Sequence, residues 1–255
     1  KQIEEDLESN RAMNRLVQGD VGSGKTAVAE LAMYKTVKSG FQAVMMAPTE
    51  LLTKQHIATL KRHFEPLGMD VRLLSGSTRA KERSEILDDL KSGKIDILVG
   101  THAVIQPDVK FADLGLVITD EQHRFGVNQR TLLAQKGENP NILVMTATPI
   151  PRTLAVILYG DLDISVIDTL PAGRKPIRTF LRYKDSRKKI YDFVEAQVKE
   201  GRQAYVVAPL IEESEAIDCK SGEEKYDELC RAYPALGIGL VHGAMKQQGK
   251  DAVIE

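Results

Sequence analysis

The sequence predicts an α/β protein built on a doubly wound, mostly parallel β-sheet with helices on both faces. Three observations predict this fold. Short apolar runs alternate with stretches of helical spacing, glycines stand where those stretches should end, and a phosphate-binding pattern joins the first apolar run to the following helix. Strands separated by helices in this way form a parallel sheet whose two faces are both covered.

The first elements are a helix and a strand that precede the phosphate-binding pattern. Between Ile3 and Met13, the apolar residues Ile3 and Leu7 lie four positions apart, as they would on one face of a helix. Leu16-Val17 is the first short strand. A segment with helical spacing follows the pattern and ends before Gly40.

The phosphate-binding pattern is G-x-x-x-x-G-K-[ST]. Gly22 and Gly24 carry no side chain that would obstruct an anion, so backbone N–H groups can surround a phosphate that also faces the N-terminus of a helix. The lysine adds a fixed positive charge near the β and γ phosphates, and the threonine hydroxyl can bind Mg²⁺. The predicted ATP-binding residues are Gly19, Asp20, Val21, Gly22, Ser23, Gly24, Lys25 and Thr26.

The remaining apolar runs predict further strands in two domains. In residues 1–170 these are Ala43–Ala47, Val71–Leu74, Ile95–Val99, Leu116–Ile118 and Ile142–Met145. A Pro/Gly-containing turn at 170–176 then separates a second series, residues 171–255. Its strands are Ile177–Leu181, Ala204–Ala208 and Ile238–Val241, with a helix from about Arg187 that turns Ile190, Phe193, Val194 and Val198 inward. So few strands predict an incomplete second domain.

Composition limits the class of protein. The 255 residues are 42% hydrophobic, enough to bury a core, and 35 Lys and Arg balance 36 Asp and Glu, so net charge identifies no partner. Two cysteines without zinc or redox spacing indicate a reducing compartment, and five scattered histidines argue against a structural metal. The charged start and the lack of a long apolar run predict a cytoplasmic protein that is not bound to a membrane.

Two acids follow the buried strand Leu116–Ile118. Asp120 and Glu121 stand where ATP hydrolysis needs carboxylates opposite the phosphate-binding loop. Asp120 is predicted to hold Mg²⁺, through water, and Glu121 to orient the attacking water. Thr119 interrupts an otherwise apolar strand.

The tetrad Asp120-Glu121-Gln122-His123 and the adjacent Arg-Phe-Gly-Val resemble the signature of superfamily 2 helicases, most closely the RecG branched-DNA translocases. Further segments match that family in order. They are Ala47–Leu52 with Gln55-His56, Gly100–Val104, Thr146–Thr153, Val207–Ser214 and Val241–Lys246. The resemblance covers nearly the whole chain. The motor of the transcription-repair coupling factor is the nearest alternative, and Gln122 favours RecG modestly.

The resemblance implies a P-loop NTPase with a RecA-like first domain, followed by part of a second RecA-like domain. It implies a monomeric ATP-dependent helicase or translocase that acts on branched DNA, such as stalled forks and Holliday junctions, in recombination and repair. ATP and Mg²⁺ would be its cofactors. The implied catalytic residues are Lys25, Asp120, Glu121, Gln122 and His123, and Thr26 and Asp120 would hold Mg²⁺. Thr146, Ala147 and Thr148 would couple nucleotide state to DNA. The hydroxyls of Thr146 and Thr148 could hydrogen-bond to Gln122 or His123.

DNA contact is expected from segments that follow two other strands. The resemblance implies that Pro48, Thr49, Thr101 and His102 touch the DNA backbone, and Thr49 could also cap the next helix. Aromatic residues are only 5% with no Trp, which disfavours base stacking and favours tracking of duplex phosphates. Eight Lys or Arg against one acid between residues 174 and 189 are either a solvated face or a DNA contact.

Two other functions stay open at this point: a nucleotide-gated DNA-binding module without translocation, and a small-molecule kinase. A kinase would leave both Asp120–His123 and the second domain unexplained. Compared with the family, we expect the branch-recognising wedge and the adenine-reading motif before residue 1, and an arginine-bearing motif beyond residue 255. These 255 residues alone are therefore expected to bind nucleotide weakly and to hydrolyse it slowly.

Overall fold

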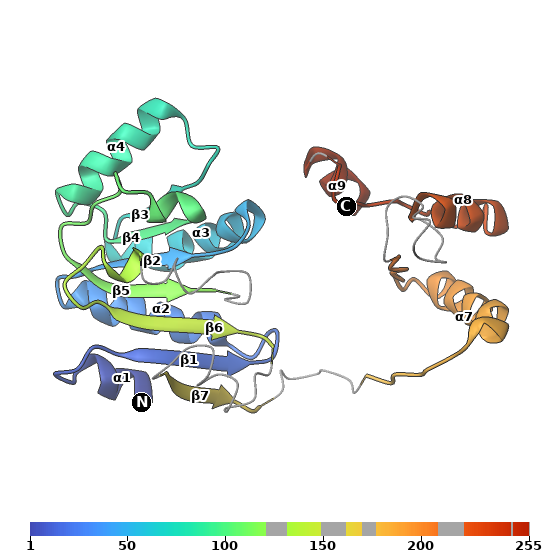
Figure 1. Cartoon of the computed structure of the whole chain (residues 1–255), viewed down its shortest axis with the longest axis horizontal. Helices are drawn as coiled ribbons and strands as arrows, with labels where there is room; N and C mark the ends of the chain where they lie inside the picture. The colour runs from blue at the N-terminus through green and yellow to red at the C-terminus, as the bar shows by residue number, and fades with distance from the viewer. Residues whose placement is uncertain (121–131, 149–161, 170–176, 209–221, 246, 255) are drawn as a thin grey trace. The chain divides into compact units, whose positions relative to one another are not determined.

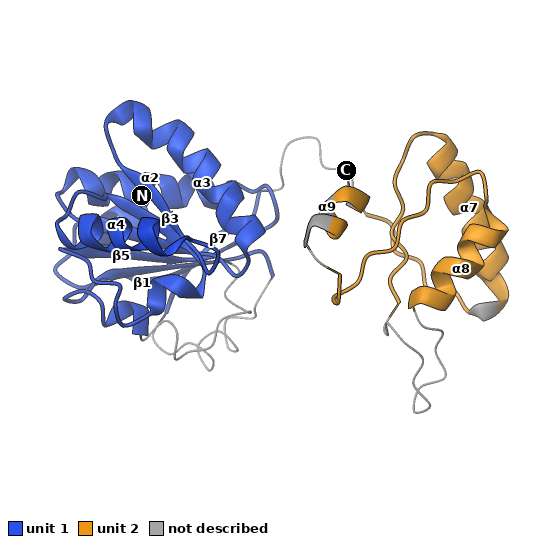
Figure 2. Ribbon diagram, turned by 90° about the horizontal axis from the view of Figure 1, so that it is seen from above, with its two compact units in different colours: residues 1–175 blue, residues 176–255 orange. Residues whose placement is uncertain are grey.

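The computed structural model describes residues 1–120, 132–148, 162–169, 177–208, 222–245 and 247–254. The chain forms two compact units, Lys1–Lys175 and Pro176–Glu255 (Figure 2). The predicted domain boundary, between residues 170 and 171, lies outside the described residues. That the second unit is RecA-like stays a prediction.

The first unit contains a sheet of seven strands, all parallel, in the order β3-β4-β2-β5-β6-β1-β7 (Figure 1). This arrangement confirms the predicted doubly wound parallel sheet. The strands are β1 Asn14–Gly19, β2 Gln42–Met46, β3 Val71–Leu74, β4 Ile97–Gly100, β5 Leu114–Thr119, β6 Asn141–Thr146 and β7 Asp163–Ile167.

Helices cover both faces of this sheet. The helices are α1 Gln2–Leu7, α2 Lys25–Lys38, α3 Glu50–Phe64 and α4 Ala80–Lys91, and short 3₁₀ helices are η1 Glu65–Leu67 and η2 His102–Ile105. Residues of α1, α2 and α3 pack into one core cluster, and residues of α4 pack into a second. The two clusters fill opposite faces of the sheet.

Strand β5 shows how alternation divides its side chains between the two clusters. Leu116 and Ile118 belong to the cluster of α2 and α3, whereas Val117 between them belongs to the cluster of α4. Continuing that alternation places Asp120, two residues after Ile118, on the side of α2 and α3. The strand therefore aims this acid toward the two helices that follow β1 and β2.

Two elements at the sheet edge differ from the prediction. Strand β7 was not predicted because its residues are half-buried or exposed, so Asp163–Ile167 lacks the long apolar run of an inner strand. The first helix ends at Leu7, well before Met13, although Ile3 and Leu7 do pack on the core as expected.

The second unit contains helices α7 Arg187–Lys199, α8 Gly222–Ala232 and α9 Gln247–Ile254, with η4 Lys184–Ser186. The helix predicted from about Arg187 is confirmed. Three predicted strands, Ile177–Leu181, Ala204–Ala208 and Ile238–Val241, are wrong, since none of them forms a strand in the described part of this unit. A strand requires a hydrogen-bonded neighbour.

Side chains of the second unit are also more exposed than predicted. Ile190 and Phe193, expected to point inward from α7, are 40% and 65% exposed, while Val194 and Val198 are half-buried. Within the described residues, no helix is long and apolar enough to cross a membrane.

Candidate nucleotide-binding site

The predicted site residues gather at the edge where the parallel strands end. Strands β5, β6 and β1 are neighbours, with Thr119 beside Val144 and Gln18 beside Thr146. Loop 19–26 follows β1, Asp120 follows β5, and Thr146–Thr148 follow the strand between them. Since neighbouring strands lie about 4.8 Å apart, β1 and β5 are separated by roughly 10 Å. A triphosphate can span such a distance.

The loop between β1 and α2 has the backbone that an anion cradle requires. Gly22 and Gly24 have φ of 79° and 94°, the left-handed region that glycine enters without strain. Gly24 is the N-cap of α2, and Lys25 is its first residue. The first N–H groups of α2 therefore face the loop, where a phosphate can accept them.

Side chains of the loop also fit a phosphate group. Lys25 Nζ donates to the carbonyl oxygens of Gly19 and Asp20, at 2.8 and 2.9 Å, so its charge is held against the loop. Ser23 Oγ is buried and has no hydrogen-bond partner among the described residues. A Cβ at Gly19 would come within 2.5 Å of that oxygen. An unpartnered buried hydroxyl beside a glycine-lined loop suits a ligand with oxygen atoms.

Asp120 lies at the end of β5 and is 9% exposed. Its backbone N–H donates to the carbonyl of Met46 at 2.9 Å, which continues the pairing of β5 with β2. His56 Nε2 on α3 lies 2.8 Å from its Oδ2. Glu121, Gln122 and His123 lie outside the described residues, so the structure places one of the four residues in the predicted tetrad.

Thr146 and Thr148 hydrogen-bond to each other. Their Oγ1 atoms are 2.9 Å apart, and the backbone N–H of Thr148 donates to Thr146 Oγ1 at 3.2 Å. The predicted bonds to Gln122 or His123 fall outside the described residues. Thr146 is buried, Ala147 half-buried and Thr148 exposed, so this segment carries the end of β6 from the core to the surface.

The residues predicted to contact DNA follow strands on the other side of β5. Thr49 Oγ1 accepts the backbone N–H of Leu52 at 3.3 Å, which confirms Thr49 as the N-cap of α3. Pro48 precedes it and is half-buried. Thr101 is the N-cap of η2, without a side-chain cap bond, and His102 is exposed.

A close backbone approach fixes the start of the Thr101–His102 segment. A Cβ at Gly100 would meet the carbonyl oxygen of Leu74 at 2.1 Å and Val104 Cγ1 at 2.5 Å. Only glycine fits at position 100, because any Cβ would collide with the backbone of β3 and with a side chain of η2. The segment therefore leaves β4 at a fixed place on the sheet edge.

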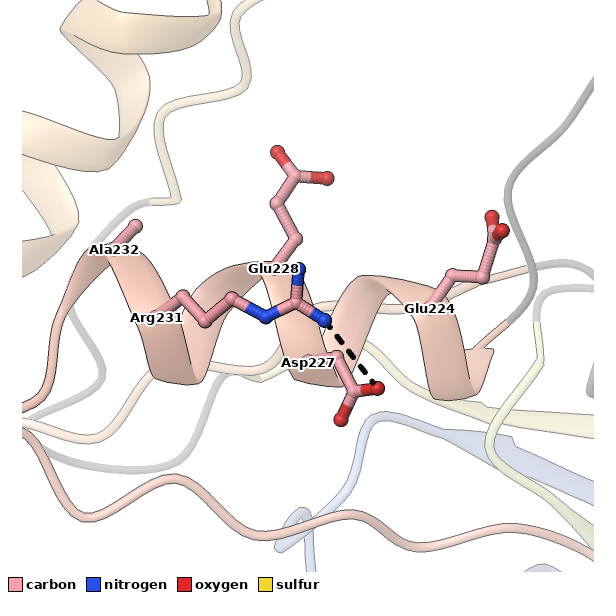
Figure 3. A pocket seen from close by; sticks show the side chains of 5 residues that line it. All are labelled: Glu224, Asp227, Glu228, Arg231 and Ala232. Atoms are coloured by element: carbon pink, nitrogen blue, oxygen red, sulfur yellow. Dashed lines mark ion pairs between the residues drawn. The ribbon is translucent and has the colours of Figure 1, made fainter.

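A pocket in the second unit does not fit a ligand site. Figure 3 shows its lining on one helix, α8, where Arg231 Nη2 lies 3.9 Å from Asp227 Oδ2. Both side chains are well exposed, and acidic residues dominate the lining. Phosphate binding is therefore disfavoured at this pocket, in contrast to loop 19–26.

Two features of the site were not predicted. The contact of His56 with Asp120 joins residues 64 positions apart, so no spacing along the sequence could indicate it. The burial of Ser23 Oγ depends on the fold of the loop. No group of three or more His, Cys, Asp or Glu in the described residues is arranged for a metal.

The parallel sheet, the glycine-lined loop after β1 and the buried acid after β5 define a P-loop NTPase with a RecA-like first unit. The family model of the DEAD/DEAH box helicases matches residues 2–157. The chain therefore belongs to the DEAD/DEAH box helicase family.

Comparisons with individual proteins agree with the resemblance to RecG. The chain is 50% identical over its full length to the ATP-dependent DNA helicase RecG of Bacillus subtilis and 48% identical to that of Thermotoga maritima. It spans 37% and 33% of those proteins. A solved structure of RecG bound to a three-way DNA junction matches 99% of the chain and 33% of that protein, with a TM-score of 0.78 and 43% identity. The predicted resemblance to RecG is confirmed.

Proposed function

We propose that the protein is an ATP-dependent DNA helicase, or double-stranded DNA translocase, that acts on branched DNA in recombination and repair. The observation that carries this proposal is the order of the segments along one sheet edge. The loop that fits phosphate, the Thr146–Thr148 segment and Asp120 follow β1, β6 and β5, and the candidate DNA segments follow β2 and β4 directly beyond. The similarity to RecG helicases supports it.

For ATP hydrolysis, each side chain has a proposed part. Lys25 and the first N–H groups of α2 bind the β and γ phosphates. Thr26 and Asp120 hold Mg²⁺, which neutralises charge that develops on the phosphate oxygens. Glu121 orients the attacking water, and Gln122 and His123 pass the state of the γ phosphate to Thr146 and Thr148.

For DNA, the proposed contacts are to the phosphate backbone. The N-terminus of α3, capped by Thr49, and the Thr101–His102 segment offer backbone N–H groups and polar side chains to phosphates. Such contacts position a duplex without reading its sequence. A translocase needs this property because it must move along any sequence.

In the intact protein, we infer that ATP binding and hydrolysis alternate the grip of two RecA-like domains on duplex DNA, and so move it. In such motors an arginine supplied by a second domain contributes about 10³- to 10⁵-fold to the rate of hydrolysis. A monomer is proposed. The RecG relatives come from bacteria, in which ATP and chromosomal DNA share the cytoplasm, so we propose that the activity lies there.

The test is ATPase activity of the intact protein with forked, duplex and single-stranded DNA in parallel. The proposal expects the greatest stimulation by forks. It also expects a Glu121→Gln variant to retain ATP binding while its turnover slows by roughly 10²-fold or more. Equal rates on all three DNAs, or normal turnover in Glu121→Gln, would refute it. Dependence on RNA polymerase would select a transcription-repair coupling motor instead, and binding without strand displacement would select a nucleotide-gated module.

A further inference from the structure

His56 makes a side-chain contact that none of the roles described above uses. Its Nε2 lies 2.8 Å from Asp120 Oδ2, and the two side chains are only 11% and 13% exposed. With its proton on Nε2, the imidazole donates this hydrogen bond. A bond to a carboxylate that is shielded from water in this way is stronger than one on the open surface.

Helix α3 holds His56 in place from both ends. Thr49 caps its first turn, and Leu60 and Phe64 bury its last turns in the core cluster beneath the sheet. His56 stands between them on the same face, one turn before Leu60. The imidazole is therefore carried by a rigid element and approaches Asp120 from the side of the helices.

The carboxylate of Asp120 has to adopt one orientation for metal chemistry. Its main chain is fixed by the bond from its N–H to Met46, but that bond leaves the side-chain torsions free. A carboxylate has two oxygens, so a donor that engages Oδ2 sets the plane of the group while Oδ1 remains for Mg²⁺ or its water. Partners of metal-binding carboxylates often act in this manner.

We propose that His56 is a positioning residue that orients the Asp120 carboxylate for Mg²⁺ when ATP binds. The inference rests on the proposed function, because it takes Asp120 as the acid that holds the metal. It extends the site from the strand ends to α3, the helix that follows the candidate DNA segment Pro48-Thr49. A buried histidine that only completes the packing of α3 is the structural alternative.

The experiment titrates Mg²⁺ against binding of a fluorescent ATP analogue to the intact protein. His56→Ala should raise the Mg²⁺ concentration for half-maximal binding about tenfold or more, the usual effect of losing such a partner. Affinity in EDTA should stay unchanged, because loop 19–26 still holds the phosphates. His56→Gln can place an amide N–H near the position of Nε2, so it should restore much of the Mg²⁺ response.

The matched control is His63→Ala. His63 lies on the same helix and is 44% exposed; among the described residues its side chain pairs with Glu30 at 2.9 Å and with Arg62 at 3.3 Å. Its Mg²⁺ titration should match that of the wild type. Melting temperatures of all variants separate loss of folding from loss of orientation.

The outcomes test the positioning role of His56 and the proposed function separately. An unchanged Mg²⁺ titration in His56→Ala would overturn the positioning role, and so would a loss in EDTA equal to the loss in Mg²⁺. Failure of His56→Gln to recover any of the response, at normal melting temperature, would also count against it. The proposed function itself would fail if Lys25→Ala and Asp120→Asn bound nucleotide and Mg²⁺ as the wild type does.

Discussion

The ammonium group of Lys25 is the positive charge that loop 19–26 places next to its own backbone. It donates to two loop carbonyls and begins the helix whose N-terminus faces the loop. A phosphate that enters the loop would take up this donor, and a charged hydrogen bond contributes about 1.5–3 kcal/mol. The residue therefore joins the backbone of the loop to the charge of its proposed ligand.

Lys25→Ala should weaken binding of ATP by about 10- to 100-fold, which corresponds to that range of energies. Lys38→Ala is the control, because Lys38 is an exposed lysine at the other end of the same helix. Equilibrium binding of a fluorescent ATP analogue measures both. Equal affinities in the two variants would remove Lys25 from the site.

The ion pair of Asp108 with Arg83 predicts that the stability of the first unit depends on pH in the acid range. The hydrogen bond from Arg83 Nη2 to Asp108 Oδ2, 2.8 Å long, lowers the pKa of this carboxyl group. A carboxyl group with a lowered folded pKa stabilises the fold above its unfolded pKa, about 3.9, and this stabilisation is lost as pH falls through the folded value. Asp108 is half exposed, so the contribution is about 1 kcal/mol at most.

Asp108→Asn should therefore unfold more easily than the wild type at neutral pH, and the difference should shrink as pH falls below about 4. Urea unfolding over a series of pH values measures it. Arg83→Gln removes the other partner and should give the same trend. A difference that stays constant down to the acid limit would show that the ion pair is not its source.

At the scale of elements, Arg15 connects three pieces of the first unit. Its guanidinium group on β1 donates to Asp6 on α1 and, at 2.9 Å, to Ser165 on β7. The side chain is only 10% exposed, so these bonds are largely shielded from water. Gln2 accepts from the same serine, which joins the start of α1 to β7 as well.

Arg15→Ala should lower the free energy of unfolding by about 1.5–3 kcal/mol, because it leaves the partly buried carboxylate of Asp6 without its partner. Thermal unfolding, with Arg72→Ala as a control on a more exposed pair, would measure the loss. A change no larger than that of the control would mean that α1 and β7 are held by apolar packing alone.

Strands that are buried on both faces of the sheet were predictable from sequence, whereas the structure of the apolar runs in the second unit was not. Strands such as β2 and β5 consist of apolar runs, so their existence followed from the residues alone. Val207 and Phe180 belong to runs that look similar, yet they are 90% and 66% exposed in segments that form no strand. The difference is the presence of a hydrogen-bonded neighbour, which an apolar run does not encode.

The candidate site also has features that were predictable from the sequence and features that were not. Loop 19–26 and Asp120 were predictable because a phosphate-binding pattern and two acids after an apolar run are short local patterns. The contact between His56 and Asp120 was not, since it depends on α3 packing against the same face of the sheet toward which Asp120 points. Local chemistry can be recognised in a sequence, whereas the partners that orient it require the fold.

At the scale of the whole molecule, the sheet order divides the first unit into a nucleotide side and a proposed DNA side. Asp120, directly after β5, borders both, because β2 lies on one side of that strand and β6 on the other. The segments proposed to bind nucleotide and those proposed to bind DNA are thus neighbours on one edge. A change at a bound γ phosphate would therefore have to travel only a strand or two to reach the proposed DNA segments.

The central claim is that loop 19–26 and Asp120 hold a single magnesium-bound triphosphate. The most direct measurement is a crystal structure of the intact protein with Mg²⁺ and a non-hydrolysable ATP analogue. We predict the β and γ phosphates in loop 19–26 against Lys25, with Mg²⁺ between Thr26 and Asp120. A triphosphate bound elsewhere, or a metal ion that neither Thr26 nor Asp120 approaches, would contradict the account.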